Sequence, residues 1–229
     1  MASSATVVEA CVQTLVSAVA AEAAGADRIE LCVNLAEGGV TPSAGSVRAA
    51  RSRVQIPIHV LIRPRAGDFV YDEGEFEVML LDIREARRSG ADGVVLGALT
   101  RGAMVDREIT ARLAAAARPL AVTFHRAVDQ TPDLGAAVAT LVELGIERVL
   151  TSGGAETAEQ GIPALASLVD RFGASITILA GGGVRAGNAA RIARTTRVPE
   201  LHLGPTLPGR GDLDVAALKA VVHQLASGG

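Results

Sequence analysis

The sequence of 229 residues is very poor in aromatic residues and contains a single lysine. Aromatic residues make up 2% of the chain and tryptophan is absent, so there are few platforms on which nucleic-acid bases could stack. With a net charge of −3 and no basic stripe, the chain is not expected to bind nucleic acid. The one lysine, Lys219, lies in the last predicted helix and not on a predicted strand. This excludes aldolases that form a Schiff base through a lysine amine beside the substrate.

The sequence also has few cysteines, and neither a leader-like segment nor a long apolar run is recognised in it. Two cysteines in a chain of this length provide no disulfide framework. The first six residues lack a charged segment followed by an apolar one, so no secretory leader is predicted. Apolar stretches are broken by Glu22 or by glycine well before they reach the length of a membrane span. We therefore predict a soluble cytoplasmic protein that does not enter the membrane.

Short β-branched runs alternate eight times with longer helix-like stretches, and no Pro/Gly/Ser-rich linker divides them. This alternation is typical of a closed parallel barrel, so we predict one domain over residues 1–229, a single (β/α)8 TIM-type barrel. The alternative is a doubly wound open sheet. That fold would normally place a phosphate loop after the first strand, where Val12-Gln13-Thr14 stands instead. The expected strands are Val7–Val12, Arg28–Val33, Pro57–Arg63, Gly93–Gly97, Leu120–His125, Arg148–Ser152, Ser175–Gly181 and Glu200–Gly204.

Both cysteines close the same short phrase, Glu-x-Cys, within the first two predicted strands. Positions two apart on a strand share a face, so Glu9 points to the same side as Cys11, and Glu30 to the same side as Cys32. Two soft ligands on neighbouring strands suit a thiophilic metal such as Cu(I). The alternative is that both cysteines are small buried hydrophobes, which is the usual state of free cysteine.

Three of the four histidines fall on the predicted inward face of the barrel. His59, His125 and His202 occupy inward-facing positions of their own predicted strands, as the cysteines do, and so does Arg63. Active sites of these barrels form at the carboxyl ends of the strands, where Arg63 and His125 stand. His59 and His202 could equally be hydrogen-bonded histidines lower in the barrel.

The loop after the third strand contains two arginines and an acid, Arg63, Arg65 and Asp68. Arginine presents a planar fork that matches a carboxylate or a phosphate, so these residues are candidates for binding an anionic ligand. The alternative is an Arg–Asp pair that only stiffens the loop.

The segment after the fifth strand brings an imidazole, a fixed positive charge and a carboxylate together. His125, Arg126 and Asp129 could serve acid–base chemistry, with Arg126 also available to an anion. After the seventh strand comes a glycine run that includes Gly182 and Gly183. Such loops often bind phosphate in this fold, although a glycine run can equally serve only a tight turn.

Several segments of the chain closely resemble the copper homeostasis protein CutC family. The phrases Arg-Pro-Arg-x-Gly-Asp-Phe and Phe-His-Arg-Ala-x-Asp are the most specific of them. The resemblance implies a TIM-type barrel, a homo-oligomer (dimer or tetramer), copper binding and a role in copper tolerance. The resembling segments are Gly25–Cys32, Glu37–Ser43, Ile62–Phe69, Thr123–Asp129 and Arg148–Gly153.

Carried over position by position, the resemblance implies that Cys11 and Cys32 are Cu(I) ligands. The chain departs from the family at Val70, where some relatives carry a cysteine, and at Leu203-Gly204-Pro205-Thr206, where relatives tend to have small polar residues. The residues implied to line the barrel mouth are Glu9, Glu30, His59, Arg63, Arg65, Asp68, His125 and Arg126.

Two functions are compatible with these residues. The first is a copper-binding homeostasis protein with Cu(I) on the two cysteines. The second is an enzyme for a small anionic substrate, for which copper is incidental. In that enzyme Arg63 and Arg65 would hold the anion, and His125 would act as acid or base with Glu9 or Glu30 as its counterpart. The fold does not distinguish them, because this barrel hosts many unrelated chemistries.

Overall fold

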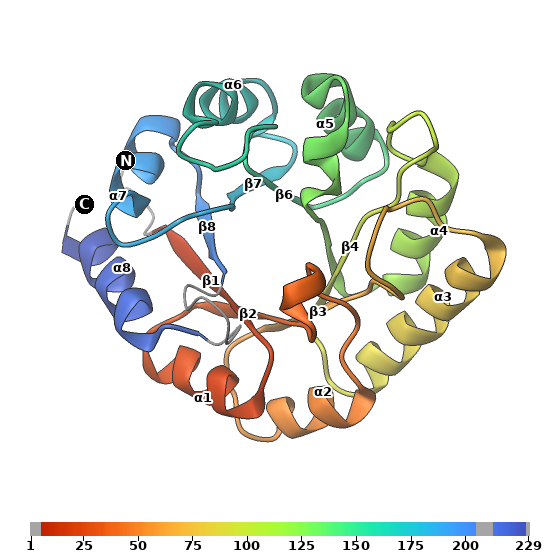
Figure 1. Ribbon diagram of the computed structural model, residues 1–229, viewed down its shortest axis with the longest axis horizontal. Coiled ribbons are helices and arrows are strands. Elements are labelled where there is room, and N and C mark those ends of the chain that lie inside the picture. The colour runs from red at the N-terminus through yellow and green to blue at the C-terminus, as the bar shows by residue number, and fades with distance from the viewer. Residues whose placement is uncertain (1–5, 205–212, 228–229) are drawn as a thin grey trace.

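Eight parallel strands close into a barrel in this computed structural model, which describes residues 6–204 and 213–227 (Figure 1). Each strand pairs with the next in the sequence, and β1 pairs with β8 to close the ring. The predicted (β/α)8 barrel is therefore confirmed. The strands are β1 Val7–Val12, β2 Arg28–Leu31, β3 Ile58–Leu61, β4 Gly93–Leu96, β5 Ala121–Phe124, β6 Arg148–Thr151, β7 Thr177–Ala180 and β8 Glu200–Leu203.

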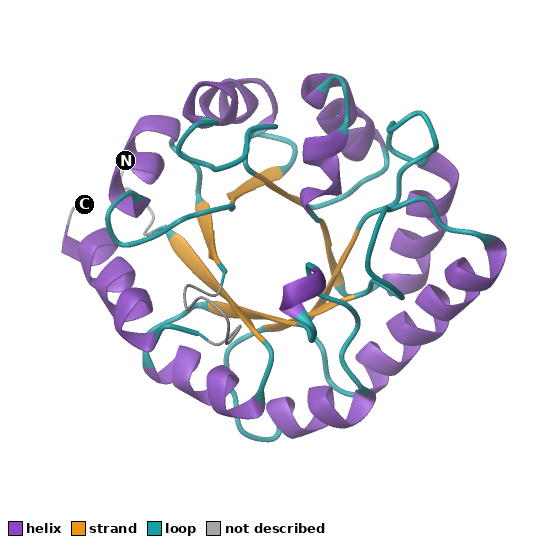
Figure 2. Cartoon of the chain, viewed as in Figure 1, coloured by secondary structure: helices purple, strands orange, loops and turns teal. Residues whose placement is uncertain are grey.

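The helices form an outer ring around the strands (Figure 2). Two short 3₁₀ helices, η1 and η2, follow β2 and β5 on the side where the strands end. Within the described ranges, none of the helices has the length and apolar character needed to cross a membrane. The helices are α1 Leu15–Ala23, η1 Leu35–Glu37, α2 Ala44–Arg51, α3 Glu73–Arg88, α4 Arg107–Ala117, η2 Arg126–Gln130, α5 Leu134–Glu143, α6 Ile162–Phe172, α7 Ala189–Thr196 and α8 Val215–Ser227.

Side-chain caps explain where most of these helices begin. Thr14, Ser43 and Asp106 each accept a hydrogen bond from a backbone N–H in the first turn of the following helix. At α3, Asp72 and Glu75 form a reciprocal capping box. Capping therefore fixes where α1, α2, α3 and α4 begin.

The two faces of the strands divide as the alternation predicts. Val8, Ala10 and Ile29 point outward and are fully buried against the helices. The inward face carries charged and polar side chains, including Glu9 and Arg28, which are also buried. The polar interior is thus enclosed by an apolar ring between the barrel and its helices.

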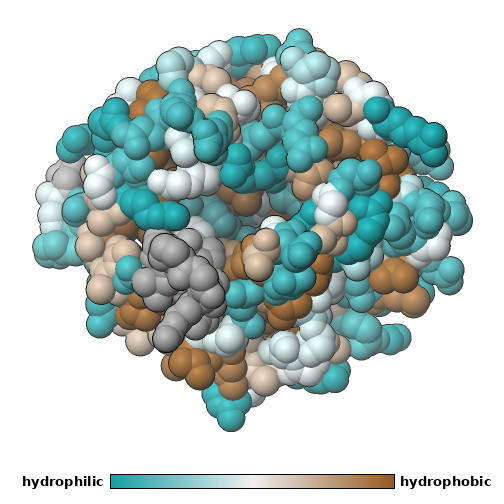
Figure 3. Space-filling model, in the orientation of Figure 1, coloured by the Kyte–Doolittle hydropathy of each residue, from teal (hydrophilic) through white to brown (hydrophobic). Residues whose placement is uncertain are grey.

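Two inward glycines make room for histidine rings inside the barrel. A Cβ atom on Gly93 would lie 2.6 Å from the ring of His59, and one on Gly97 would lie 2.5 Å from the ring of His125. Each histidine thus fills space that a side chain on β4 or at its end would otherwise occupy. Seen along the direction of Figure 1, the surface is mostly hydrophilic around a hollow at its centre (Figure 3).

Candidate functional site

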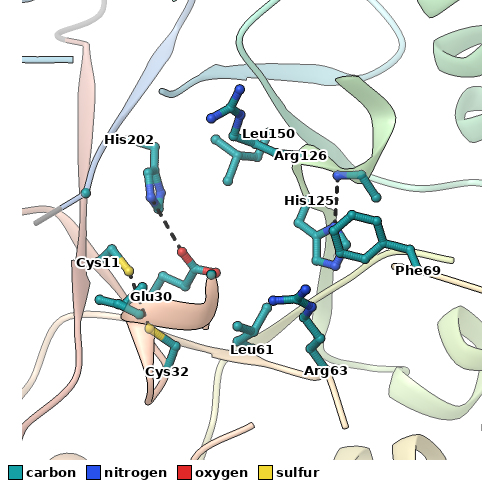
Figure 4. A pocket seen from close by; sticks show the side chains of 14 residues that line it. Cys11, Glu30, Cys32, Leu61, Arg63, Phe69, His125, Arg126, Leu150 and His202 are labelled. Atoms are coloured by element: carbon teal, nitrogen blue, oxygen red, sulfur yellow. Dashed lines mark hydrogen bonds and ion pairs between the residues drawn. The ribbon is translucent and has the colours of Figure 1, made fainter. Parts of the chain in front are cut away.

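A cavity of about 180 Å³ lies at the carboxyl ends of the strands (Figure 4). Cys11 and His202 approach it from one side, and Arg63 and His125 from the other. This is the end at which TIM barrels place their active sites. The residues that line it are Cys11, Glu30, Cys32, Leu35, Gly38, Leu61, Arg63, Phe69, His125, Arg126, Ala127, Leu150, His202 and Gly204.

Cys11, on β1, and Cys32, directly after β2, face each other. The Sγ atoms of Cys11 and Cys32 are 3.5 Å apart, and both residues are free thiols. The Cys32 thiol also lies 3.7 Å from the carbonyl oxygen of Val12. The hydrogen bond to Cys32, burial and the nearby Glu30 charge all raise the pKa of the Cys11 thiol well above its usual range. Cys11 is therefore protonated in the absence of a ligand that displaces its proton.

A carboxylate and an imidazole stand beside Cys11. Ligand atoms of Cys11, Glu30 and His202 all lie within 4.8 Å of one another, and Nε2 of His202 is 3.5 Å from the Glu30 carboxylate. Burial raises the pKa of Glu30. Burial lowers the pKa of His202, but its hydrogen bond to Glu9 and the two carboxylate charges outweigh burial and raise it. This wall therefore offers sulfur, nitrogen and oxygen donors together.

Below the cavity, the barrel interior holds a network of buried ion pairs. Arg28 bonds to both Glu9 and Glu200, and Arg148 forms a two-point pair with Glu200 at 2.6 and 3.0 Å. Nδ1 of His202 donates to the Glu9 carboxylate at 2.8 Å. Burial opposes the ionised form of Glu9, but His202 and Arg28 outweigh it and hold the pKa well below its usual range. Glu9 is thus an ionised carboxylate that does not line the cavity.

His59 lies in this lower part of the barrel and does not line the cavity either. Burial lowers the pKa of His59 to about 4, against the opposing influence of the Glu9 charge, so the ring is neutral at neutral pH. Among the described residues, Nδ1 of His59 has no hydrogen-bond partner.

Arg63 and His125 form the opposite wall of the cavity. The aromatic ring of Phe69 covers both, with its centroid 5.0 Å from the Arg63 guanidinium carbon and 4.8 Å from the His125 ring centroid. Nδ1 of His125 accepts a hydrogen bond from the backbone N–H of Ala127 at 3.2 Å. Burial and the Arg63 charge lower the pKa of His125 to about 3. His125 is therefore a neutral imidazole.

The structure separates Arg65 and Asp68 from Arg63. Arg65 pairs with Glu75 and, at 2.9 Å, with Asp68, and neither Arg65 nor Asp68 lines the cavity. Two carboxylates thus neutralise Arg65 within its own loop and α3. This matches the alternative in which an Arg–Asp pair stiffens the loop.

Arg126 reaches the cavity rim but already has a counterion. Its Nε donates to Asp129 at 2.9 Å, and its Nη2 donates to the Ser152 hydroxyl at 2.9 Å. Gly182 and Gly183 have φ values of 99° and 71°, and a Cβ on Gly182 would lie 3.0 Å from the Arg126 guanidinium. The positive φ values therefore explain glycine at both positions, and the close approach of Arg126 further explains it at Gly182.

Residues 6–206 match the CutC family. The chain belongs to the CutC family. Its resemblance to that family, carried by the arginine-rich and histidine-containing loops, is thereby confirmed. The human copper homeostasis protein cutC homolog is 49% identical to this CutC-family chain over 194 residues, which cover 85% of the chain and 71% of the human protein. A family protein CutC from Mesorhizobium japonicum is 46% identical over 195 residues, covering 85% of the chain and 76% of that protein.

Solved structures agree with the family and the fold. A putative copper homeostasis protein CutC from Streptococcus agalactiae superposes with a TM-score of 0.81 at 36% identity, covering 86% of this CutC-family chain and 97% of that one. N-(5'-phosphoribosyl)anthranilate isomerase from Pyrococcus furiosus gives a TM-score of 0.67 at 14% identity, covering 97% and 99%. At that identity the isomerase supports the barrel fold alone. Pro205 and Thr206, where the chain was expected to depart from the family, lie outside the described residues.

Proposed function

We propose that this CutC-family protein binds copper in copper homeostasis and holds Cu(I) between Cys11 and Cys32. The observation that carries the proposal is the pair of reduced thiols, 3.5 Å apart, in the wall of a cavity. Soft thiolates are the ligands that Cu(I) prefers. The name of the human relative, a copper homeostasis protein, supports the same assignment.

The distance between the two sulfurs limits how they can bind a metal. At a metal–sulfur bond of about 2.3 Å, as in zinc thiolates, a linear arrangement would separate the sulfurs by about 4.6 Å. The observed separation is 3.5 Å. The thiols must therefore move apart on binding, or a third donor must complete a bent site. His202 and Glu30 stand beside Cys11 and could supply that donor.

A competition titration under anaerobic conditions tests the assignment. Purified full-length protein is titrated with Cu(I) against a chromophoric chelator, alongside a Cys11→Ser/Cys32→Ser double variant. We expect one tightly bound Cu(I) per chain in the parent, and loss of tight binding in the double variant. Leu150→Val, which alters a lining residue without removing a donor atom, is the matched control and should bind like the parent. Equal affinity of parent and double variant would refute the proposal.

The cellular setting is proposed from the same family membership. We propose that the protein is cytoplasmic and assembles as a dimer or tetramer, without membrane or nucleic-acid partners. Light scattering coupled to size-exclusion chromatography measures the subunit number directly. A mass equal to one chain across micromolar concentrations would contradict the oligomer.

A further inference from the structure

Arg63 is a buried cation without a counterion among the described residues. Arg63 is only 5% exposed. Nη1 donates to the carbonyl oxygens of Glu37 at 3.1 Å and Gly39 at 2.8 Å, and Nη2 donates to that of Gly67 at 2.7 Å. By contrast, buried Arg28 pairs with two carboxylates. A buried charge is costly unless an opposite charge lies beside it. An anionic group of a ligand beside Arg63 would therefore be stabilised by this charge.

His125 supplies a second, independent observation on the same wall. The residue is 7% exposed, and its Nε2 atom is buried without a hydrogen-bond partner in the described part of the chain. Nδ1 accepts from the backbone N–H of Ala127, so the proton of the neutral ring is on Nε2. The ring is neutral because its pKa is lowered to about 3 by burial and the Arg63 charge. The result is a buried N–H donor that lacks an acceptor.

The opposite wall does not neutralise Arg63. Glu30 lies across the cavity, next to Cys11 and His202 (Figure 4). Among the described residues, the Glu30 carboxylate pairs with His202, 3.5 Å away, and not with Arg63. The space between the walls is bordered by the apolar side chains of Leu61 and Leu150. A ligand entering beside this wall meets the unpaired charge of Arg63, one N–H donor and apolar surface, while Arg126 at the rim is already paired with Asp129.

We propose that the Arg63–His125 wall binds the carboxylate of a small organic monoanion whose apolar body fills the cavity. A cavity of about 150 Å³ accommodates benzene, so the observed volume of about 180 Å³ fits a ligand of similar size that carries one carboxylate. The carboxylate accepts from Nε2 of His125 and compensates the charge of Arg63. The proposal goes beyond copper binding, since it uses no cysteine.

The surroundings favour a carboxylate over a phosphate. A phosphate dianion would bring a second negative charge toward Glu30, whereas the wall offers one unpaired positive charge. The glycine loop after β7, where this fold often binds phosphate, is packed by Arg126, which is already paired with Asp129. The expected pair of anion-binding arginines is thereby reduced to Arg63, since Arg65 is neutralised by Asp68 and Glu75.

Titration calorimetry on the metal-free, reduced full-length protein tests the proposal. The probes are benzoate and 3-methylbutanoate, their neutral amides, and inorganic phosphate. We expect at least one carboxylate to bind, with its amide and phosphate at least about tenfold weaker, because a charge-assisted hydrogen bond is lost. In long-range ¹H–¹⁵N spectra, saturation with that carboxylate should shift the Nε2 signal of His125.

Matched variants locate the site. Arg63→Met should weaken carboxylate binding about 10- to 100-fold, whereas Arg65→Met, which removes an arginine two residues away, should leave it unchanged. His125→Gln keeps a donor near the position of Nε2 and should bind better than His125→Phe. The Cys11→Ser/Cys32→Ser variant should retain carboxylate binding, so that this proposal and the copper assignment succeed or fail separately.

Several results would overturn the carboxylate site. These are no carboxylate binding to the parent protein, amides or phosphate binding as tightly as carboxylates, or equal losses in Arg63→Met and Arg65→Met. Loss of binding in the double cysteine variant would assign the ligand to the thiols instead. If Arg63→Met does not fold, the comparison of carboxylate with amide and the His125 signal in the parent protein decide the question.

Discussion

Removal of Arg28 should destabilise the barrel far more than removal of a surface arginine. Arg28 lies between Glu9 and Glu200 in the barrel interior, and all three side chains are buried. In Arg28→Met, Glu9 keeps His202 and Glu200 keeps Arg148, so neither carboxylate is left without any partner. Breaking a buried ion pair from one side costs about 3–5 kcal/mol, and the remaining partners place the expected loss near the lower end, at about 3 kcal/mol.

The destabilisation by Arg28→Met should depend on pH in a defined direction. The pKa values of Glu9 and Glu200 are lowered in the folded protein, because their partners outweigh burial. Their contribution to stability is therefore complete above the ordinary glutamate pKa of 4.5 and is lost as the pH falls below it. Without Arg28 these folded-state pKa values rise. The difference in stability between parent and variant should then be largest at pH 7 and shrink toward pH 4.

Urea unfolding followed by circular dichroism at pH 7 and pH 4 measures these differences. Arg107→Met is the control, since Arg107 pairs with Glu143 on the exposed surface, where such pairs contribute about 0–1 kcal/mol. The reasoning is refuted if Arg28→Met and Arg107→Met differ by less than about 1 kcal/mol at pH 7. It is also refuted if the loss in Arg28→Met grows as the pH is lowered.

Three further predictions address the cavity and its surroundings. Gly97→Ala should cost about 1–3 kcal/mol in urea unfolding, because its Cβ would lie 2.5 Å from the His125 ring, whereas Gly187→Ala, with open space around it, should be neutral. Equal effects of the two substitutions would contradict the packing. His59→Gln should flatten the fall in stability between pH 6.5 and about 4, because the unfolded histidine takes up a proton in that range before the folded one does. The expected difference is at most about 1.4 kcal/mol per pH unit, and an unchanged slope would contradict it. Cu(I) affinity in chelator competition should rise by about tenfold per pH unit for each proton displaced, since binding must remove the proton from the Cys11 thiol. An affinity independent of pH would show that Cys11 is not a ligand.

Much of the barrel could be predicted from the sequence because strand residues alternate with a period of two. The predicted positions of β1 and β2 put Cys11 and Cys32 on the inward face of the barrel. The predicted position of β5 does the same for His125. The adjacency of the strands then brought the thiols together. The predicted barrel and family are both confirmed, while the roles of the individual site residues stay predictions.

What the sequence could not provide was the partner of each charged group. Arg63 and Arg65 look equivalent in the phrase Arg-Pro-Arg, but Arg63 continues the inward phase of β3, whereas loop geometry turns Arg65 toward Asp68 and Glu75. Arg28 was missed although it is in phase with Glu30, because a charge at the start of a strand is usually solvated. Its role depends on Glu200, 172 residues away in the sequence.

Copper X-ray absorption on the parent protein, loaded with one equivalent of Cu(I), tests the central claim most directly. If both cysteines hold the metal, the spectrum should show two sulfur neighbours in the first shell, with a third nitrogen or oxygen neighbour if His202 or Glu30 completes the site. The matched sample is Cys11→Ser/Cys32→Ser treated in the same way, which should retain no sulfur-bound copper. A first shell of nitrogen and oxygen alone in the parent protein would contradict the assignment.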